Sequence, residues 1–402
     1  MICRVIIVFA AYTWEQRKLG ELADIVGGGT PSTSNSEYWD GDIDWYAPAE
    51  IANQIFVSSS ERKITQQGYD NSSAKMLPVG TVLFTSRAGI GKTAILRKEG
   101  CTNQGFQSIV PHENMLDSYF IFSRTEELKR YGEIKGAGST FVEVSGKQMA
   151  SMELMMPKTI EEQKKIGSYF SQLDNLITLH QRKLDKLHKV KRSLLERMFP
   201  RNGANVPEIR FSGFTDAWEQ CELGAIIQAV QELTSDFENY PLYSLTIENG
   251  VTPKTERYER SFLITKETDL FKIVPEQCFV SNPMNLRFGA IGFNDSGKKV
   301  SVSGYYDVFS IDRGECSNFW CVYLKTANSL KRFDDVAIGS LIEKRRVHFS
   351  QLTEMSFPAP NMNEKRKLGE FFERLERLIT LHQRKLDKLR QIKRSMLEKM
   401  FV

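Results

Sequence analysis

The sequence predicts a mixed α/β (α+β) protein with an internal repeat, in which two globular domains are joined by two long helices that form an antiparallel coiled coil. Residues 176–187 recur unchanged as residues 378–389. A heptad pattern of apolar residues runs through both copies. The segment before each copy holds short alternating apolar runs separated by Gly, Asn and Ser, a pattern typical of strand-rich domains. These three observations favour a pseudo-twofold architecture.

The repeated helix extends outward at a constant offset of 202 residues, which pairs Gly167 with Gly369 and Ser193 with Ser395. Alternating spacings of three and four place one stripe on each helix, and two such stripes can bury each other. Packing of each helix on its own domain is the alternative. Roughly thirty helical residues at 1.5 Å each would span about 45 Å. The expected seam consists of Phe170, Leu173, Ile177, His180, Leu184, Leu187, Leu194 and Met198, and of Phe372, Leu375, Ile379, His382, Leu386, Leu389, Met396 and Met400.

The domain entrances repeat as well. Trp14-Glu15-Gln16 opens the first half and Trp218-Glu219-Gln220 opens the second. Pro and Gly between the halves indicate a linker. The predicted divisions are a first globular domain at 14–157, a first spacer helix at 158–199, a linker at 200–213, a second globular domain at 214–358 and a second spacer helix at 359–402.

The composition indicates the cellular compartment of the protein and the redox state of its cysteines. The chain has 402 residues, of which 41% are apolar, and its six cysteines lack CxxC spacing. This pattern indicates reduced thiols, no metal site and a cytoplasmic protein without a membrane association. Residues 1–11 imitate a short signal peptide, but we interpret them as a buried strand or an atypical start. Nothing before Trp14 resembles residues 206–215, which precede Trp218.

The positive charge is concentrated on the predicted helices. Residues 161–199 carry a net +4 and residues 364–402 a net +6, so the other residues carry −6 within a total of +4. A solvated helix surface and a basic face for a partner or for phosphates both explain this distribution. Tight DNA binding by the chain alone is not expected.

Two short motifs partly resemble signatures of catalytic proteins. Residues 86–93 resemble a phosphate-binding loop, but Ser86 stands where that motif needs glycine, and the following residues read as a hairpin. Residues 282–285 approach an Asn-Pro-Pro-Tyr signature of amino-methyltransferases but lack its second proline and its aromatic residue. No nucleophilic triad, paired catalytic carboxylates or metal cluster is apparent. The sequence therefore predicts a chain without catalytic residues.

The combined pattern resembles the specificity subunit of type I restriction-modification systems. The resemblance rests on Trp-Glu-Gln at 14 and 218, on residues 28–32 with 38–43, and on the helices 176–199 and 378–401. It implies that each globular domain is a target-recognition domain that reads one part of a bipartite, asymmetric sequence in double-stranded DNA. It also implies that the coiled coil docks two modification (methyltransferase) subunits, which restriction (translocase and nuclease) subunits join. S-adenosylmethionine, ATP and Mg²⁺ are then expected on the partners, and no cofactor on this chain.

Side chains that can form paired hydrogen bonds with base edges are the candidates for DNA contact, and Thr85 and Ser86 are expected to contact phosphates. Each of them is as readily an ordinary polar loop residue. The candidates are Thr85, Ser86, Arg87, Lys92, Asn103, Gln104 and Gln107 in the first half, and Asn285, Arg287, Tyr305, Tyr306, Lys344, Arg345 and Arg346 in the second.

Two other functional classes stay open from the sequence alone. One is a non-catalytic scaffold that uses its duplicated helices for assembly, and the other is a nuclease or methyltransferase whose site is not recognisable.

Overall fold

The computed structural model describes residues 14–51, 54–87, 89–137, 143–201, 203–247, 250–254, 270–312, 314–339 and 345–401. The chain divides into two compact units: unit 1 comprises Met1–Gln181 with Lys385–Val402, and unit 2 comprises Arg182–Arg384. Each unit therefore combines one globular part with one stretch of each long helix. The expected strand or atypical start at residues 1–11 lies outside the described residues.

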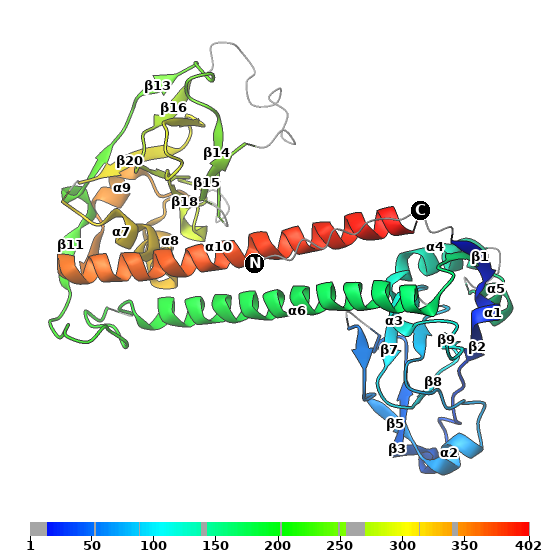
Figure 1. The fold of residues 1–402 in the computed structure, drawn as a ribbon. Coiled ribbons are helices and arrows are strands. Elements are labelled where there is room, and N and C mark those ends of the chain that lie inside the picture. Colours follow the sequence, from blue (N-terminus) through cyan, green and yellow to red (C-terminus); the bar gives the residue numbers. More distant parts are fainter. Residues whose placement is uncertain are drawn as a thin grey trace. The chain divides into compact units, whose positions relative to one another are not determined.

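The described residues of unit 1 form two larger sheets and one two-stranded pair (Figure 1). Its core gathers Val82, Phe84, Ile109 and Phe120, all fully buried. The five-stranded sheet has the order β2 (Ala23–Gly27), β9 (Gln107–Pro111), β6 (Val82–Phe84), β7 (Thr93–Leu96) and β4 (Phe56–Val57); the three-stranded sheet has the order β5 (Arg62–Ile64), β3 (Trp39–Tyr46) and β8 (Cys101–Thr102). β7 follows the loop that resembled a phosphate-binding motif, so a strand stands where that motif requires a helix.

Unit 2 repeats the plan with shorter strands. Val280, Val300 and Val308 are at the centre of its core. One sheet has the order β12 (Ile227–Ala229), β20 (Asp307–Ile311), β17 (Phe279–Ser281) and β18 (Ile291–Phe293); a second has the order β13 (Leu233–Thr234), β16 (Phe271–Val274) and β19 (Val300–Val302); and β14 (Tyr243–Thr246) pairs with β15 (Gly250–Pro253).

The entrance strand of each unit pairs with the strand before its long helix, in an equivalent antiparallel register. Glu15 lies opposite Met156 in unit 1, and Glu219 lies opposite Ala359 in unit 2. The repeated Trp-Glu-Gln motifs thus close each unit at the same point. These pairs are formed by β1 (Glu15–Lys18) with β10 (Glu153–Met156) and by β11 (Glu219–Glu222) with β21 (Ser356–Ala359).

Short helices follow one order in both units. Ser145 caps the last short helix of unit 1 by a capping box with Gln148, and His348 begins the corresponding capping box in unit 2 with Gln351. The helices of unit 1 are α1 (Leu19–Leu22), η1 (Ser36–Tyr38), α2 (Gln66–Asp70), α3 (Ser118–Ser123), α4 (Thr125–Gly136) and α5 (Gly146–Ala150); those of unit 2 include η2 (Leu223–Ala225), η4 (Leu286–Phe288), α7 (Ser317–Tyr323), α8 (Ala327–Val336) and α9 (Phe349–Thr353).

The two long helices are α6 (Ile160–Arg197) and α10 (Met362–Met400). They lie where the heptad pattern placed the spacer helices, and their antiparallel direction is visible inside each unit. In unit 1, Lys393 Nζ lies 2.6 Å from Asp174 Oδ1; in unit 2, Lys191 forms an ion pair with Glu376. These two pairs are related by the 202-residue repeat. Lys191 and Lys393, which continue the spacing of three and four on α6 and α10, are therefore paired with acidic residues of the other helix.

The residues of the predicted seam lie on the less exposed side of both long helices. Phe170, Leu173 and Leu184 are buried on α6, and Phe372 and Leu386 are buried on α10. Every other predicted seam position, including both histidines, is at most partly exposed. The alternation of three and four thus marks the buried side of both helices.

A phenylalanine follows the end of each long helix and packs in an aromatic cluster beside the first half of the other helix. In unit 1, the Phe401 ring lies 6.0 Å from Trp14, 5.7 Å from Phe120 and 6.2 Å from Phe170. Unit 2 repeats the arrangement: the Phe199 ring lies 6.1 Å from Trp218, 5.9 Å from Phe319 and 5.7 Å from Phe372.

Glycine allows each long helix to approach a short one. A Cβ added at Gly167 would lie 3.0 Å from the backbone nitrogen of Phe120 in α3, and one added at Gly369 would lie 3.0 Å from that of Phe319 in α7. Any larger residue would force the two helices apart in that unit. The repeated glycines read from the sequence thus have a packing role.

Candidate nucleic-acid interface

Four loops meet at one edge of the unit 1 sheet, and we call them loop cluster 1: residues 28–32, 85–92, 103–107 and 143–146. Backbone hydrogen bonds connect them. Ser86 N donates to Gly105 O at 2.8 Å, and Val144 N donates to Ser86 O at 3.1 Å. Gly29 N donates to Thr102 O at 2.8 Å, beside the third loop. Residues distant in the sequence are thereby held on one rigid frame.

Unit 2 has a corresponding loop cluster 2, made of residues 282–290, 303–307, 338–339 and 345–347. Val347 N donates to Pro283 O at 2.9 Å, which matches the bond between Val144 and Ser86 in unit 1. The Arg346 guanidinium lies 5.7 Å from the Tyr305 ring centroid. The same three connections therefore converge in both units: the loop after β6 or β17, the loop before β9 or β20, and the loop before α5 or α9.

Loop cluster 1 brings together most of the candidates from the first half. Arg87, Lys92 and Gln104 are exposed, whereas Asn103 and Gln107 are partly buried. Asn103 Oδ1 accepts the backbone N–H of Gly105 at 2.8 Å, so part of its hydrogen-bonding capacity holds its own loop. The accessible side chains are two cations and several amides, which suit guanine and adenine edges respectively.

Thr85 and Ser86, which were expected to contact phosphates, are fully buried. Thr85 Oγ1 donates to Gly89 O at 2.7 Å and accepts the backbone N–H of Lys92 at 2.9 Å. Its hydroxyl closes the loop that carries Arg87 and Lys92. Burial leaves neither Thr85 nor Ser86 accessible to a phosphate, so their role in this structure is to shape the loop.

Sequence reasoning missed the residues that position loop 28–32. The indole Nε1 of Trp45 donates to Gly29 O at 2.8 Å, and that of Trp39 donates to Ser32 O at 3.1 Å. Thr30 Oγ1, carried between these anchors, donates to Gln104 Oε1 at 2.5 Å. The tryptophans were visible in the sequence, but their bonds reach back to residues whose proximity no local pattern reports.

In loop cluster 2, Asn285 and Tyr305 are exposed and Tyr306 is partly buried. The backbone carbonyl of Asn285 accepts the N–H groups of Phe288 at 2.9 Å and Ala290 at 3.0 Å, so this loop is a tight turn. Arg346 and Tyr305 come together as a cation–π pair. Lys344 lies outside the described residues.

Arg287 and Arg345, both proposed as base readers, have structural partners. Arg287 Nη1 lies 2.9 Å from Asp334 Oδ1, and only 8% of the Arg287 side chain is exposed. Arg345 Nη2 donates to the Asp334 carbonyl at 2.7 Å and its Nε donates to the Ala337 carbonyl at 3.1 Å. Arg345 thus binds carbonyls at the C-terminus of α8, a position that favours cations. These two arginines support the cluster more than they face outward.

Burial also alters the ionisation of Tyr306 and of Asp307, the first residue of β20. Desolvation raises the pKa of the Tyr306 hydroxyl. Desolvation likewise raises the pKa of the Asp307 carboxyl, and Lys272 and His348 only partly oppose this effect.

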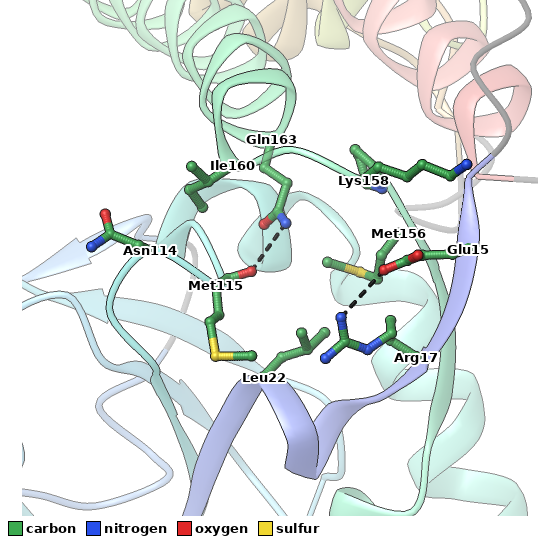
Figure 2. Close-up of a pocket in the computed structure, with 10 residues that line it drawn as sticks. Glu15, Arg17, Leu22, Asn114, Met115, Met156, Lys158, Ile160 and Gln163 are labelled. Carbon is green, nitrogen blue, oxygen red and sulfur yellow. Dashed lines mark hydrogen bonds and ion pairs between the residues drawn. The ribbon is translucent and has the colours of Figure 1, made fainter.

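A separate hollow of about 120 Å³ lies at the start of α6 in unit 1 (Figure 2). Gln163 Nε2 donates to Met115 O at 3.1 Å, and Gln163 Oε1 accepts the Asp117 N–H at 3.1 Å. Arg17 forms an ion pair with Glu15 at 3.2 Å. Gln163, Arg17 and Glu15 are therefore engaged in structural bonds, and the hollow contains none of the candidate residues.

Among the described residues, His, Cys, Asp and Glu side chains do not gather in groups of three that could hold a metal ion. No helix in that part of the chain combines the length and the apolar character needed to cross a membrane.

The two units have equivalent loop frames and different exposed side chains, so they present two similar but non-identical loop surfaces. Residues 12–189 match the family described as type I restriction modification DNA specificity domain. The resemblance inferred from the sequence is confirmed over this part of the chain.

Curated relatives carry the same description. Over 189 residues the chain is 36% identical to the type I restriction enzyme MjaIX specificity subunit of Methanocaldococcus jannaschii, covering 46% of this chain and 44% of that protein. Over 174 residues it is 31% identical to the EcoR124I/EcoR124II specificity subunit of Escherichia coli, covering 41% and 42%. The chain thus matches less than half the length of each of these relatives.

The fold extends the likeness beyond the matched half. The crystal structure of the type I restriction-modification system S subunit from M. genitalium superposes with a TM-score of 0.56 at 14% identity, covering 98% of both chains. The predicted fold class, a mixed α/β chain with two long helices, is therefore confirmed. At this identity the likeness concerns the fold alone.

Proposed function

We propose that this chain is the DNA sequence-specificity subunit of a type I restriction-modification complex and that each unit reads one part of a bipartite target. The observation that carries the proposal is the duplicated loop cluster within a chain whose residues 12–189 match the specificity-domain family. Loops on a rigid sheet are the usual place for recognition residues. The equivalent bonds from Val144 to Ser86 and from Val347 to Pro283 give both units the same frame.

The two half-sites differ because the exposed chemistry of the two clusters differs. Cluster 1 offers amides and cations, namely Gln104, Arg87 and Lys92. Cluster 2 offers an aromatic surface with a cation, represented by Tyr305 and Arg346. Because base edges are distinguished by their donors, acceptors and methyl groups, these surfaces select different bases. The target is accordingly asymmetric.

Two copies of a modification subunit would dock on the long helices, and a repeated apolar patch supports this assignment. Leu179 of α6 and Leu381 of α10 are each 61% exposed and are related by the 202-residue repeat. Neither belongs to the buried seam. Each unit holds one exposed patch of three apolar helix residues: Leu176, Leu179 and Ile392 in unit 1, and Leu378, Leu381 and Val190 in unit 2.

The register of the helices supports treating each set as one patch. The 202-residue repeat relates Leu176 to Leu378 and Val190 to Ile392. In unit 1, the ion pair between Asp174 and Lys393 places the segments of α6 and α10 that carry Leu176 and Ile392 side by side. Exposed clustered leucines are typical of protein contacts. Two equivalent patches suit two copies of one partner.

The reaction chemistry is assigned to the partners. The curated relatives are specificity subunits by name. We assign methyl transfer from S-adenosylmethionine to the modification subunits, and ATP- and Mg²⁺-dependent cleavage to restriction subunits that join the complex. This chain supplies the contacts that choose the sequence, and it carries no catalytic residue in this proposal.

The docking proposal is tested by counting bound modification subunits with native mass spectrometry. Leu179→Asp and Leu381→Asp are each expected to leave one bound subunit where the unchanged chain binds two, and the double variant none. Val79→Asp is the matched control, because Val79 is also 61% exposed but lies outside the helices. Unchanged stoichiometry in the double variant would refute the assignment of these patches.

The recognition proposal is tested by selecting bound duplexes from a random library with the chain and its modification subunit together. Two blocks of defined bases separated by unspecified bases are expected. Gln104→Ala should relax one block and Arg346→Ala the other. An assembled complex that enriches no sequence would instead favour the alternative, a scaffold that uses the helices only for assembly.

A further inference from the structure

An exposed phenylalanine stands at the tip of loop cluster 2. Phe288 is the last residue of η4 and is 52% exposed. Leaving much of an aromatic ring in water forfeits burial that stabilises the fold. The ring is therefore a candidate for contact with a ligand.

The loop that carries Phe288 is rigid. Leu286 anchors it with 1% exposure, and Gly289 ends η4 in the left-handed conformation at φ +96°. The Gly289 N–H donates to the Leu286 carbonyl at 2.9 Å. A side chain on such a turn is presented in one position before any ligand binds, which lowers the entropic cost of binding.

A charged side chain packs against the Phe288 ring. The Arg287 guanidinium lies 4.3 Å from the Phe288 ring centroid and is held by Asp334 at 2.9 Å. The other face of the loop is apolar: a Cβ added at Gly289 would lie 3.8 Å from Ile247, whose side chain is also exposed. Phe288 thus belongs to a small apolar surface with an arginine at its margin.

The corresponding loop of unit 1 exposes different side chains. There the apolar residue, Ile90, is buried, and its side chain lies against Gly132 and Gly136 of α4. The loop after β6 therefore presents polar groups, and the loop after β17 presents an aromatic ring. Because the two loops occupy the same position in the two units, the difference in their side chains changes what each unit recognises.

We infer that Phe288 is a specificity-determining residue that recognises thymine in the half-site read by unit 2, through apolar contact with the C5-methyl group. The inference rests on the proposed function and deepens it. In the major groove the thymine methyl is the apolar feature that separates T·A from C·G pairs, and phenylalanine is among the side chains that contact it. Arg287, which Asp334 holds at 2.9 Å, packs against the ring and keeps it in this position.

The test uses the chain bound to its modification subunit and a duplex that carries the target mapped for that complex. Each thymine of the half-site assigned to unit 2 is replaced in turn by uracil, which removes only the methyl group. One replacement is expected to weaken binding about fourfold, the value for one buried methyl group. In the Phe288→Ala variant the same replacement should have no effect, and Phe288→Leu should retain part of it.

Leu233→Ala is the matched control, because Leu233 is 51% exposed but lies on β13. It should keep the full uracil effect. A complex that binds and selects its target, yet shows no uracil effect that depends on Phe288, would overturn this inference and leave the proposed function intact. Loss of modification-subunit binding in Phe288→Ala, with DNA selectivity unchanged, would also overturn it and assign the surface to a protein contact. A complex without any sequence preference would overturn both.

Discussion

Replacing Phe199 with alanine should destabilise unit 2 although Phe199 precedes the linker and belongs to the first half of the sequence. The ring is 2% exposed and packs against Trp218, Phe319 and Phe372. Removing roughly 150 Å² of buried apolar area at about 25 cal/mol/Å² costs about 4 kcal/mol. This agrees with the range of about 3–5 kcal/mol for buried Phe→Ala changes.

Hydrogen exchange followed by mass spectrometry is the appropriate assay, because a chain of two units does not unfold as a single two-state system. A loss of about 4 kcal/mol lowers protection roughly a thousandfold. The loss should appear in α7 and in the first turns of α10, whereas β6 and β9 of unit 1 keep their protection. Reduced protection in unit 1 alone, or equally in both units, would refute the reasoning.

Phe401→Ala is the matched control for this experiment. Phe401 occupies the repeated position in unit 1, but it is partly exposed. Its replacement should lower protection around α3 and the start of α6, by less than Phe199→Ala lowers it in unit 2.

Three further outcomes are expected. Arg210→Ala should destabilise unit 2 by about 3–5 kcal/mol, measured as reduced hydrogen-exchange protection of that unit, because it leaves the 1% exposed Glu364 carboxylate without its 2.6 Å partner; a change below about 1 kcal/mol would contradict this. Asp307→Asn should raise the stability of unit 2 at neutral pH, because burial raises the Asp307 pKa. The gain should shrink as the pH falls through that raised pKa, and a gain independent of pH would disprove the cause. Trp45→Phe removes the hydrogen bond to Gly29 and should relax one block of the selected target, with unchanged selectivity as the opposing result.

The long helices could be predicted in detail because a heptad pattern reports burial directly. The alternating spacing of three and four identified the seam. The repeat predicted that the polar residues interrupting the seam would occupy matching positions on the two helices. What the pattern could not supply was the partner of each interruption: Lys393 binds Asp174, and Lys191 binds Glu376, across two different helices. Ion pairs between distant segments depend on register, which the spacing within one helix does not contain.

The individual roles of the candidate loop residues could not be read from the sequence. The loops after β6 and β17 occupy corresponding places in the two units. Thr85, however, is buried by its own loop, and Arg287 is engaged by Asp334, 47 residues further along the chain. A polar residue in a Gly-rich segment carries no local sign of burial. Phe288 was missed because an apolar residue between two short strands normally signals core.

The central claim is that this chain chooses a bipartite DNA target for a modification enzyme. The most direct measurement is genome-wide mapping of methylated adenine in cells that contain the chain and its neighbouring modification subunit, compared with cells that lack only this chain. The account predicts a split motif, with a few defined bases on either side of a fixed gap, that disappears without the chain. An unchanged methylation pattern, with the modification subunit active in both strains, would contradict it.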